Sequence, residues 1–89
     1  MAAWFVYMVR CRNGSLYTGI TNDVELRIAA HNSGKGAKYT RAFGPVKLVY
    51  QKKMRSATLA RHREAMIKKM QKGEKEQLLA TGTDQVLLQ

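Results

Sequence analysis

The hydrophobic and polar positions of the first twenty residues predict a β-hairpin. Residues 3–11 form an aromatic and β-branched run with almost no polar interruption, which is typical of a central strand covered on both faces. Residues 12–15 contain the pair Asn13-Gly14, which tolerates the positive φ angles of a tight turn. Residues 16–20 then return as a second, antiparallel strand.

The length of this turn decides which side chains share a face, because strand side chains alternate. A two-residue loop puts Tyr17 on the opposite face from Tyr7. A three-residue loop, with Gly14 in the left-handed position of a bulge, puts both rings on one face. In that register Val9 or Cys11 pairs with Tyr17. Spacing alone leaves both loops open, and a site shared by the two tyrosines requires the bulged one.

The pattern after the hairpin predicts a helix over residues 23–32. Asn22 is the expected N-cap, with Glu25 at the N3 position of a capping box. Val24 and Ile28 supply the buried stripe, and Gly34 is expected to end the helix in the left-handed conformation. Residues 34–45 are predicted to be a loop that is too polar and too rich in glycine to be core.

The second half of the chain predicts one more strand and two more helices. Residues 46–50 alternate loosely as a third strand, and Ser56 is the expected cap of a long helix over residues 57–72. The predicted apolar face of this helix consists of Leu59, Ala60, Met66, Ile67 and Met70. Its predicted outward side carries Arg61, Arg63, Lys68 and Lys69. Glu64 lies at the border of the apolar face.

Gly73 is expected to interrupt this helix, and residues 74–80 to form a short last one. The predicted architecture is therefore α+β, a three-stranded antiparallel sheet flanked by helices in the order β-β-α-β-α-α. We assign residues 1–82 to one domain and residues 83–89 to a C-terminal tail, whose Val86, Leu87 and Leu88 are candidates to dock on the body.

The charge of the chain changes this picture from a fold to a class of partner. Its 89 residues carry 16 Lys+Arg against 6 Asp+Glu, a formal net charge of +10. Such a field attracts polyanions, so nucleic acid is the leading partner, although basic residues also simply solubilise a surface. The single Cys11 cannot form an internal disulfide, which predicts strand packing in a reducing compartment. Without an apolar run near the roughly 18 residues of a membrane span, we expect a cytoplasmic protein with no membrane partner.

Cations alternate with aromatic residues in the predicted loop. This pattern suits contact with a phosphate backbone combined with stacking on bases. The residues expected to bind nucleic acid are Lys35, Lys38, Tyr39, Arg41 and, from the long helix, Lys68.

Several short motifs resemble those of the GIY-YIG nuclease family. They are Phe5-Val6-Tyr7, Tyr17-Thr18-Gly19, and then Arg27, His31 and Glu64 on later helices. The run from Tyr17 to Asp23 and the run from His31 to Arg41 are similar to a short, stand-alone bacterial branch of that family. The resemblance covers nearly the whole chain, and the three-stranded antiparallel sheet of the family agrees with the order of elements predicted above.

The resemblance implies a divalent-metal phosphodiesterase that cuts nucleic acid by attack of water on phosphorus. Glu64 would hold the metal, Mg²⁺ or Mn²⁺, as a single hard oxygen ligand. Arg27 would stabilise the charge that grows on the pentavalent phosphate. Tyr7 or Tyr17 would orient and deprotonate the water, although an unperturbed tyrosine titrates near 10 and needs help at neutral pH.

Two further residues have roles implied by the resemblance. Gly19 would leave room for close approach of backbone or substrate, and His31 would hydrogen-bond a tyrosine or a phosphate. We expect all the catalytic candidates to converge on one concave surface beside the basic loop. Many members of the wider family carry a buttressing asparagine near the C-terminus, and residues 71–77 of this chain contain none.

Three functions remain open from the sequence. The first is a metal-dependent endonuclease directed by nucleic-acid structure, with DNA favoured over RNA and a protein partner supplying the substrate. The second is a non-catalytic nucleic-acid-binding module that retains the nuclease fold. The third is a protein-interaction domain that uses Met54, Met66 and Met70, although methionines on helix faces are more often core filler.

Overall fold

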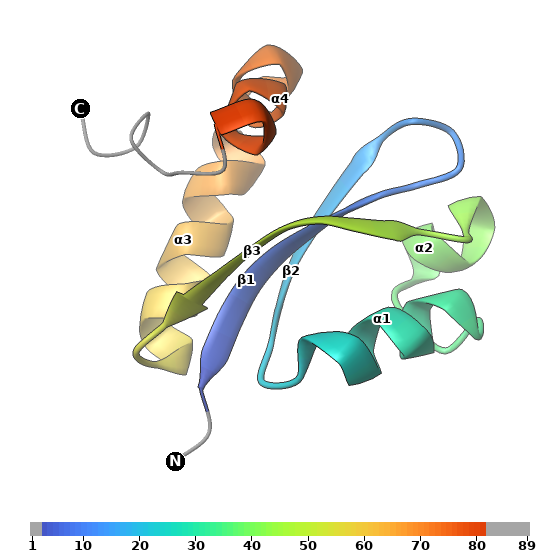
Figure 1. The fold of residues 1–89 in the computed structure, drawn as a ribbon, viewed down its shortest axis with the longest axis horizontal. Helices are drawn as coiled ribbons and strands as arrows, with labels where there is room; N and C mark the ends of the chain where they lie inside the picture. The colour runs from blue at the N-terminus through green and yellow to red at the C-terminus, as the bar shows by residue number, and fades with distance from the viewer. Residues whose placement is uncertain (1–2, 82–89) are drawn as a thin grey trace.

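The apolar run at the start of the chain forms the central strand of the sheet. Strand β1 (Trp4–Arg10) lies between β2 (Leu16–Thr21) and β3 (Lys47–Met54), and all neighbours are antiparallel. The computed structural model describes residues 3–81, drawn in Figure 1. The predicted α+β class and the order of elements are confirmed, with one additional short helix before β3. Strand β3 also runs beyond the predicted residues 46–50 to Met54.

The hairpin between β1 and β2 has the bulged, three-residue turn. Val9 pairs with Tyr17 and Tyr7 pairs with Gly19, so the two tyrosines share one face of the sheet. Gly14 takes the left-handed conformation with φ of 87°. The register that a shared site requires is therefore the one that the structure has.

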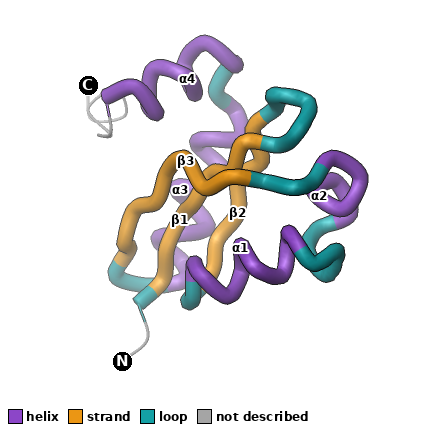
Figure 2. Tube along the Cα trace, turned by 45° about the vertical axis from the view of Figure 1, so that its right-hand side comes forward, coloured by secondary structure: helices purple, strands orange, loops and turns teal. Residues whose placement is uncertain are grey.

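The two faces of β1 feed two separate hydrophobic clusters, because alternate side chains point to opposite sides of a strand. One cluster packs Val6 and Met8 against helices α3 (Ala57–Lys69) and α4 (Lys72–Thr81). The other packs Tyr7, Val9 and Cys11 against the side of helices α1 (Val24–Asn32) and α2 (Lys38–Phe43). Figure 2 shows α1 and α2 on the side of the sheet opposite to α3. Cys11 lies one residue beyond the end of β1 and is a buried free thiol, so its predicted role in packing is confirmed although it is outside the strand.

Helix α1 ends at the predicted residue 32 but begins at residue 24, one residue later than predicted, because its N-cap differs. Asp23, rather than Asn22, is the cap, and its carboxylate accepts a hydrogen bond from the N–H of Leu26. Glu25 therefore stands one position too early to complete a capping box. At the other end Gly34 has φ of 83°, and Lys35 N–H donates to the carbonyl of Ala30, which is the Schellman arrangement that the glycine predicted.

The prediction of a loop over residues 34–45 is wrong, because it contains helix α2. Thr40 of this helix is fully buried and Phe43 packs against the tyrosine-side cluster, so the segment contributes to the core despite its polar composition. Thr40 and Phe43, which face the core, are three positions apart, as expected for one turn of a helix. Six residues are nevertheless too few to show a clear helical periodicity in the sequence.

The long helix α3 begins at the predicted cap Ser56, which accepts a hydrogen bond from Leu59 N–H, and ends at Lys69 rather than at residue 72. Its buried face consists of Ala60, Arg63 and Ile67. The predictions that Leu59 and Met66 are buried and that Arg63 points outward are wrong. Arg63 fits the interior because its guanidinium donates to the hydroxyl of Tyr50 at 3.3 Å.

The prediction that Gly73 interrupts the helical segment is wrong, since Gly73 lies inside α4. The break falls at residues 70–71, where the carboxylate of Glu74 accepts from Gln71 N–H and caps the new helix. The predicted tail, residues 83–89, and its Val86, Leu87 and Leu88 lie outside the described residues. Within residues 3–81, no helix is both long and apolar enough to cross a membrane.

Candidate active site

The centre of the candidate site is a buried hydrogen bond between a strand and a helix. The hydroxyl of Tyr7 on β1 lies 2.8 Å from Nε2 of His31 on α1, and both side chains are 1% exposed. These two residues are 24 positions apart in the sequence, so the contact fixes α1 against the sheet. Burial raises the pKa of Tyr7 and lowers the pKa of His31, because each charged form loses its hydration.

Thr40 of α2 determines which nitrogen of His31 carries the proton. Its hydroxyl donates to the carbonyl of Ala37 at 2.9 Å, and its oxygen lies 2.6 Å from His31 Nδ1. Since the threonine hydroxyl has one hydrogen, which this bond uses, we assign the proton of His31 to Nδ1, from which it is donated to Thr40. The neutral imidazole then has a free lone pair on Nε2, and the Tyr7 hydroxyl donates to it.

Two glycines make room for this pair. Gly19 pairs with Tyr7 in the sheet, and a Cβ at position 19 would lie 2.6 Å from the Tyr7 hydroxyl oxygen. A Cβ at position 36 would likewise collide with Nδ1 and the backbone of His31. Any side chain at either glycine would push the ring out of its hydrogen-bonded position.

Arg27 brings a cation to the same phenol. It lies one helical turn before His31 on α1, and its Nε donates to the Tyr7 hydroxyl at 3.4 Å. The hydrogen bond to Tyr7 raises the pKa of Arg27. The positive charge of Arg27 also contributes to lowering the pKa of His31, which keeps the imidazole neutral.

Tyr17 completes the cluster from the side of β2. Its ring meets the ring of His31 edge-on, with centroids 5.4 Å apart. On its other side it lies nearly parallel to Tyr39 of α2, at 6.5 Å and an interplanar angle of 14°. The sequence-predicted residues Tyr7, Tyr17, Arg27 and His31 therefore form one connected cluster, in which Tyr7 contacts His31 and Arg27, and Tyr17 contacts His31.

Glu64 stands apart from this contact network. It lies on α3, half-buried with 22% of its side chain exposed, and Oε2 is 3.1 Å from Nζ of Lys68. Its negative charge is close enough to contribute to raising the pKa of Tyr7. The structure thus places Glu64 within electrostatic reach of the phenol but gives it an ion pair of its own.

The donor set at Glu64 limits the metals that it fits. Among residues 3–81 there is no group of three or more His, Cys, Asp or Glu side chains that could together hold an ion. A single carboxylate fits a Mg²⁺ ion that keeps most of its water and takes further oxygens from a phosphate, and it does not fit a zinc site.

Of the residues predicted to bind nucleic acid, two border a groove next to the cluster. This groove, about 400 Å³ in volume, is lined by Leu16, Tyr17, Thr18, Tyr39, Lys68 and Lys75. Tyr39 and Lys68 were predicted from the sequence, whereas Lys75 was not. Lys35, Lys38 and Arg41 are exposed but do not line this groove.

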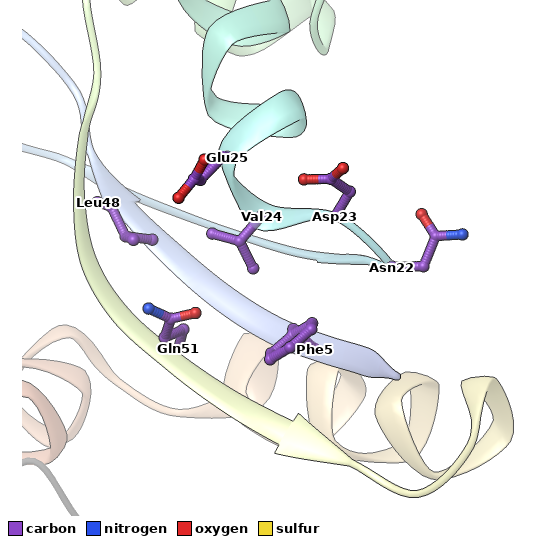
Figure 3. Close-up of a pocket in the computed structure, with 7 residues that line it drawn as sticks. All are labelled: Phe5, Asn22, Asp23, Val24, Glu25, Leu48 and Gln51. Carbon is purple, nitrogen blue, oxygen red and sulfur yellow. The ribbon is translucent and has the colours of Figure 1, made fainter. Parts of the chain in front are cut away.

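A second cavity lies away from these residues. It has a volume of about 420 Å³. Figure 3 shows the residues that line it, Phe5, Asn22, Asp23, Val24, Glu25, Leu48 and Gln51. Its two carboxylates would repel a phosphate backbone, and it contains none of the predicted catalytic residues. Its size is therefore no indication of a nucleic-acid site.

Sequence analysis missed Thr40 and Gly36 as members of the site. Both follow from the position of His31, since one is its hydrogen-bond partner and the other is the gap that its ring needs. The available signal was a small polar residue three positions before Phe43 on a short helix, and that helix was predicted to be a loop.

Comparison with known proteins identifies the family of the chain. A model of the GIY-YIG catalytic domain matches residues 3–77. A UPF0213 protein of Clostridium perfringens is 51% identical over 77 residues, which cover 86% of this chain and 83% of that protein. A UPF0213 protein of Staphylococcus haemolyticus is 52% identical, over 84% of this chain and 92% of its own.

Two solution NMR structures have a similar fold. The UPF0213 protein of Bacillus halodurans matches with a TM-score of 0.59 and 44% identity, covering 89% of this chain and 84% of that one. A protein of E. faecalis matches with a TM-score of 0.62 and 38% identity, covering 91% and 86%.

The buried neutral state of His31 makes the folding stability depend on pH. The unfolded chain protonates His31 near its ordinary pKa of 6.5, whereas the folded protein resists protonation because the pKa is lowered. The contribution of His31 to the free energy of unfolding should therefore be fully present above pH 6.5. Below that pH the free energy of unfolding should fall, by at most about 1.4 kcal/mol per pH unit for one proton. Urea unfolding between pH 7.5 and 5 measures this slope.

The chain offers a matched control, since its other histidine, His62, is exposed. His62→Gln should keep the slope and His31→Gln should lose it, whatever its absolute stability. An NMR titration of the parent protein gives an independent readout. A His31 midpoint at or above its ordinary pKa of 6.5 would contradict the assignment.

The role of Thr40 can be tested by a pair of substitutions. Thr40→Val keeps the shape but removes the acceptor for Nδ1–H, so the Nδ1–H tautomer should lose its preference and the protein should lose about 1–3 kcal/mol of stability. Thr40→Ser retains the hydroxyl and should retain the tautomer. Long-range ¹H–¹⁵N spectra of the imidazole distinguish the two tautomers. An Nε2–H tautomer in the parent protein would refute the assigned donors in the hydrogen bonds of His31 to Tyr7 and Thr40.

Proposed function

Because the chain belongs to the GIY-YIG catalytic domain family, a family of nuclease type, we propose that it is a divalent-metal-dependent endonuclease that hydrolyses phosphodiester bonds in DNA. The observation that carries the proposal is the contact of one phenol with both a neutral imidazole and a guanidinium, Tyr7 with His31 and Arg27. Phosphodiester hydrolysis needs a proton acceptor beside a fixed positive charge, and this arrangement supplies both.

The hydrogen bond to His31 removes the difficulty of a tyrosine acting as a base at neutral pH. A water that approaches the phosphorus gives its proton to the Tyr7 oxygen, while the Tyr7 hydroxyl gives its own proton to Nε2 of His31. The phenol stays neutral throughout, and the imidazole becomes the acceptor. We therefore assign water activation to Tyr7 rather than to Tyr17, with Tyr17 holding the ring of His31 from its edge.

Arg27 links this proton path to the phosphate. Its Nε is 3.4 Å from the Tyr7 oxygen, so a phosphate held by the outer nitrogens of the guanidinium lies beside the phenol. Its planar fork of donors matches the oxygens of a pentavalent phosphate. The raised pKa of Arg27 keeps the cation charged at every relevant pH.

Glu64 is the residue that would hold the metal. A bound Mg²⁺ or Mn²⁺ would neutralise phosphate oxygens and the leaving 3′-oxygen. The carboxylate is paired with Lys68, so phosphate binding near Lys68 would draw this amine away and free Glu64 as a ligand. We further propose that the protein acts in the cytoplasm, where a buried free thiol such as Cys11 stays reduced, and that a protein partner supplies the substrate.

The metal role of Glu64 is tested by comparing two carboxylates. Glu64→Gln should lower the rate of Mg²⁺-dependent cleavage by about a hundredfold or more, because the loss of a metal ligand removes several kcal/mol of transition-state stabilisation. Glu25→Gln removes the same charge from an exposed position on α1 beside the cavity of Figure 3 and should cleave like the parent protein. Labelled DNA and RNA of one sequence, single-stranded, flapped and duplex, measure the rates.

Binding in EDTA provides the control, since both variants raise the net charge equally and should bind at least as tightly as the parent protein. Cleavage by Glu64→Gln at the parental rate would contradict the proposal. Tight binding by a parent protein that cuts nothing with Mg²⁺ or Mn²⁺ would favour a non-catalytic nucleic-acid-binding module.

The choice between the two tyrosines is tested by removing each hydroxyl. Tyr7→Phe should lower the rate by about a hundredfold or more, the size of a general-base contribution, while Tyr17→Phe should lower it by about tenfold or less. The parental rate should also fall at acidic pH, because His31 must be neutral to accept the proton. Thermal unfolding checks that both variants are folded at the assay temperature, and a larger loss in Tyr17→Phe would reverse the assignment.

A further inference from the structure

The groove next to the active-site cluster has two chemically different walls. Tyr17 of β2 and Tyr39 of α2 contribute aromatic side chains to the lining, and Lys68 of α3 and Lys75 of α4 contribute cationic ones. The groove crosses β2, which is an outer strand of the sheet with β1 as its one neighbour. No carboxylate is among the residues that line it, in contrast to the cavity of Figure 3.

The aromatic wall is fixed in place although it is partly open to solvent. The Tyr39 side chain is 40% exposed, yet its hydroxyl lies 2.6 Å from Oγ of Ser15 in the hairpin. The ring of Phe43 packs against the same ring at a tilt, with centroids 4.9 Å apart. An exposed ring that is held by a hydrogen bond and by a second ring loses little entropy when a ligand stacks on it.

The cationic wall is fixed by an ion pair between α4 and the hairpin. Arg10 makes two hydrogen bonds to the carboxylate of Glu76, at 2.7 and 2.8 Å, and a third to the carbonyl of Gly14. Glu76 follows Lys75 directly on α4. The same hairpin therefore anchors both walls of the groove, through Ser15 on one side and Arg10 on the other.

We propose that this groove binds one unpaired nucleotide of the nucleic-acid substrate, with its base stacked on the ring of Tyr39 and its phosphate between Lys68 and Lys75. The volume of about 400 Å³ lies in the range of small-ligand pockets, and the combination of rings and cations matches an anionic aromatic ligand. A base inside a duplex has both faces covered by its neighbours, so only an unpaired base offers a face to Tyr39.

This site would adjoin the proposed catalytic residues on both sides. Tyr17 belongs to the groove and also contacts His31, and Lys68 belongs to the groove and also contacts Glu64. A nucleotide seated there would place the next phosphate of the strand near Arg27 and Glu64. The inference rests on the proposed action on nucleic acid, but its test does not use cleavage.

The experiment measures binding of a fluorescein-labelled oligothymidylate, and of a labelled duplex of equal length, in EDTA. Tyr39→Leu should weaken binding of the single strand by about 5- to 100-fold, the size of the loss of one base–aromatic stack, and leave duplex binding nearly unchanged. Tyr39→Phe keeps the ring but loses the anchor to Ser15, and its affinity should fall between those of the parent protein and Tyr39→Leu.

Lysines at two edges of the sheet provide a charge-matched comparison. Lys75→Ala should reduce the salt dependence of single-strand binding by about 0.7 in log–log slope, as expected for one lost phosphate contact. Lys53→Ala removes an equal charge from β3, the opposite outer strand, and should leave the slope unchanged. These lysine variants change no core residue, so they test the groove even if Tyr39→Leu fails to fold.

Unchanged single-strand affinity in folded Tyr39→Leu, an equal loss for the duplex, or equal slopes for the two lysine variants would overturn the proposal. A parent protein that shows the expected binding differences but no cleavage would refute the proposed catalysis and leave the nucleotide site standing. Cleavage without those differences would do the reverse.

Discussion

The hydrogen bond between Tyr7 and His31 is the constraint around which the rest of this small domain is arranged. It joins the central strand to α1, and it is possible only because Gly19 and Gly36 leave space on either side of the two rings. It also requires the bulged turn at Gly14, since a one-residue shift of β2 would move Gly19 out of register with Tyr7 and Tyr17 to the other face. A buried phenol and a buried imidazole each need a partner, and here each satisfies the other.

The sheet separates the chemistry from most of the structural core. Odd-numbered residues of β1 from 5 to 9 face the helices that carry Arg27, His31 and Thr40, whereas Val6 and Met8 pack against α3 and α4. From the far side, Lys68 of α3 and Lys75 of α4 line the groove beside the outer strand β2, and Glu64 of α3 pairs with Lys68. In a chain of only 89 residues, one face of β1 therefore contributes to the apolar core and the other face to the polar site.

Much of the fold and of the candidate site could be predicted, because the signals were local. The Asn13-Gly14 turn, the apolar run of β1 and the one-turn spacing of Arg27 and His31 depend on few neighbours. The errors came where tertiary contacts decide. Asn22 and Asp23 are equally good N-caps by residue type, so the sequence could not show that Asp23 is the cap. Arg63 displaced Met66 from the core because Tyr50 offers its guanidinium a partner, and helix α2 owes its position to the burial of Thr40 and Phe43.

Helix α2 is six residues long, yet it carries both the hydroxyl that orients His31 and the ring of Tyr39 that borders the groove. Under the proposed function, substrate recognition and reactivity are therefore mechanically coupled, since any tilt of this helix displaces both side chains together. A ligand that presses on Tyr39 would move Thr40 and so strengthen or weaken its hydrogen bond to His31, without contacting either residue. Differences between substrates would then appear in the rate of cleavage, and binding affinity alone would not predict which strands are cleaved fastest.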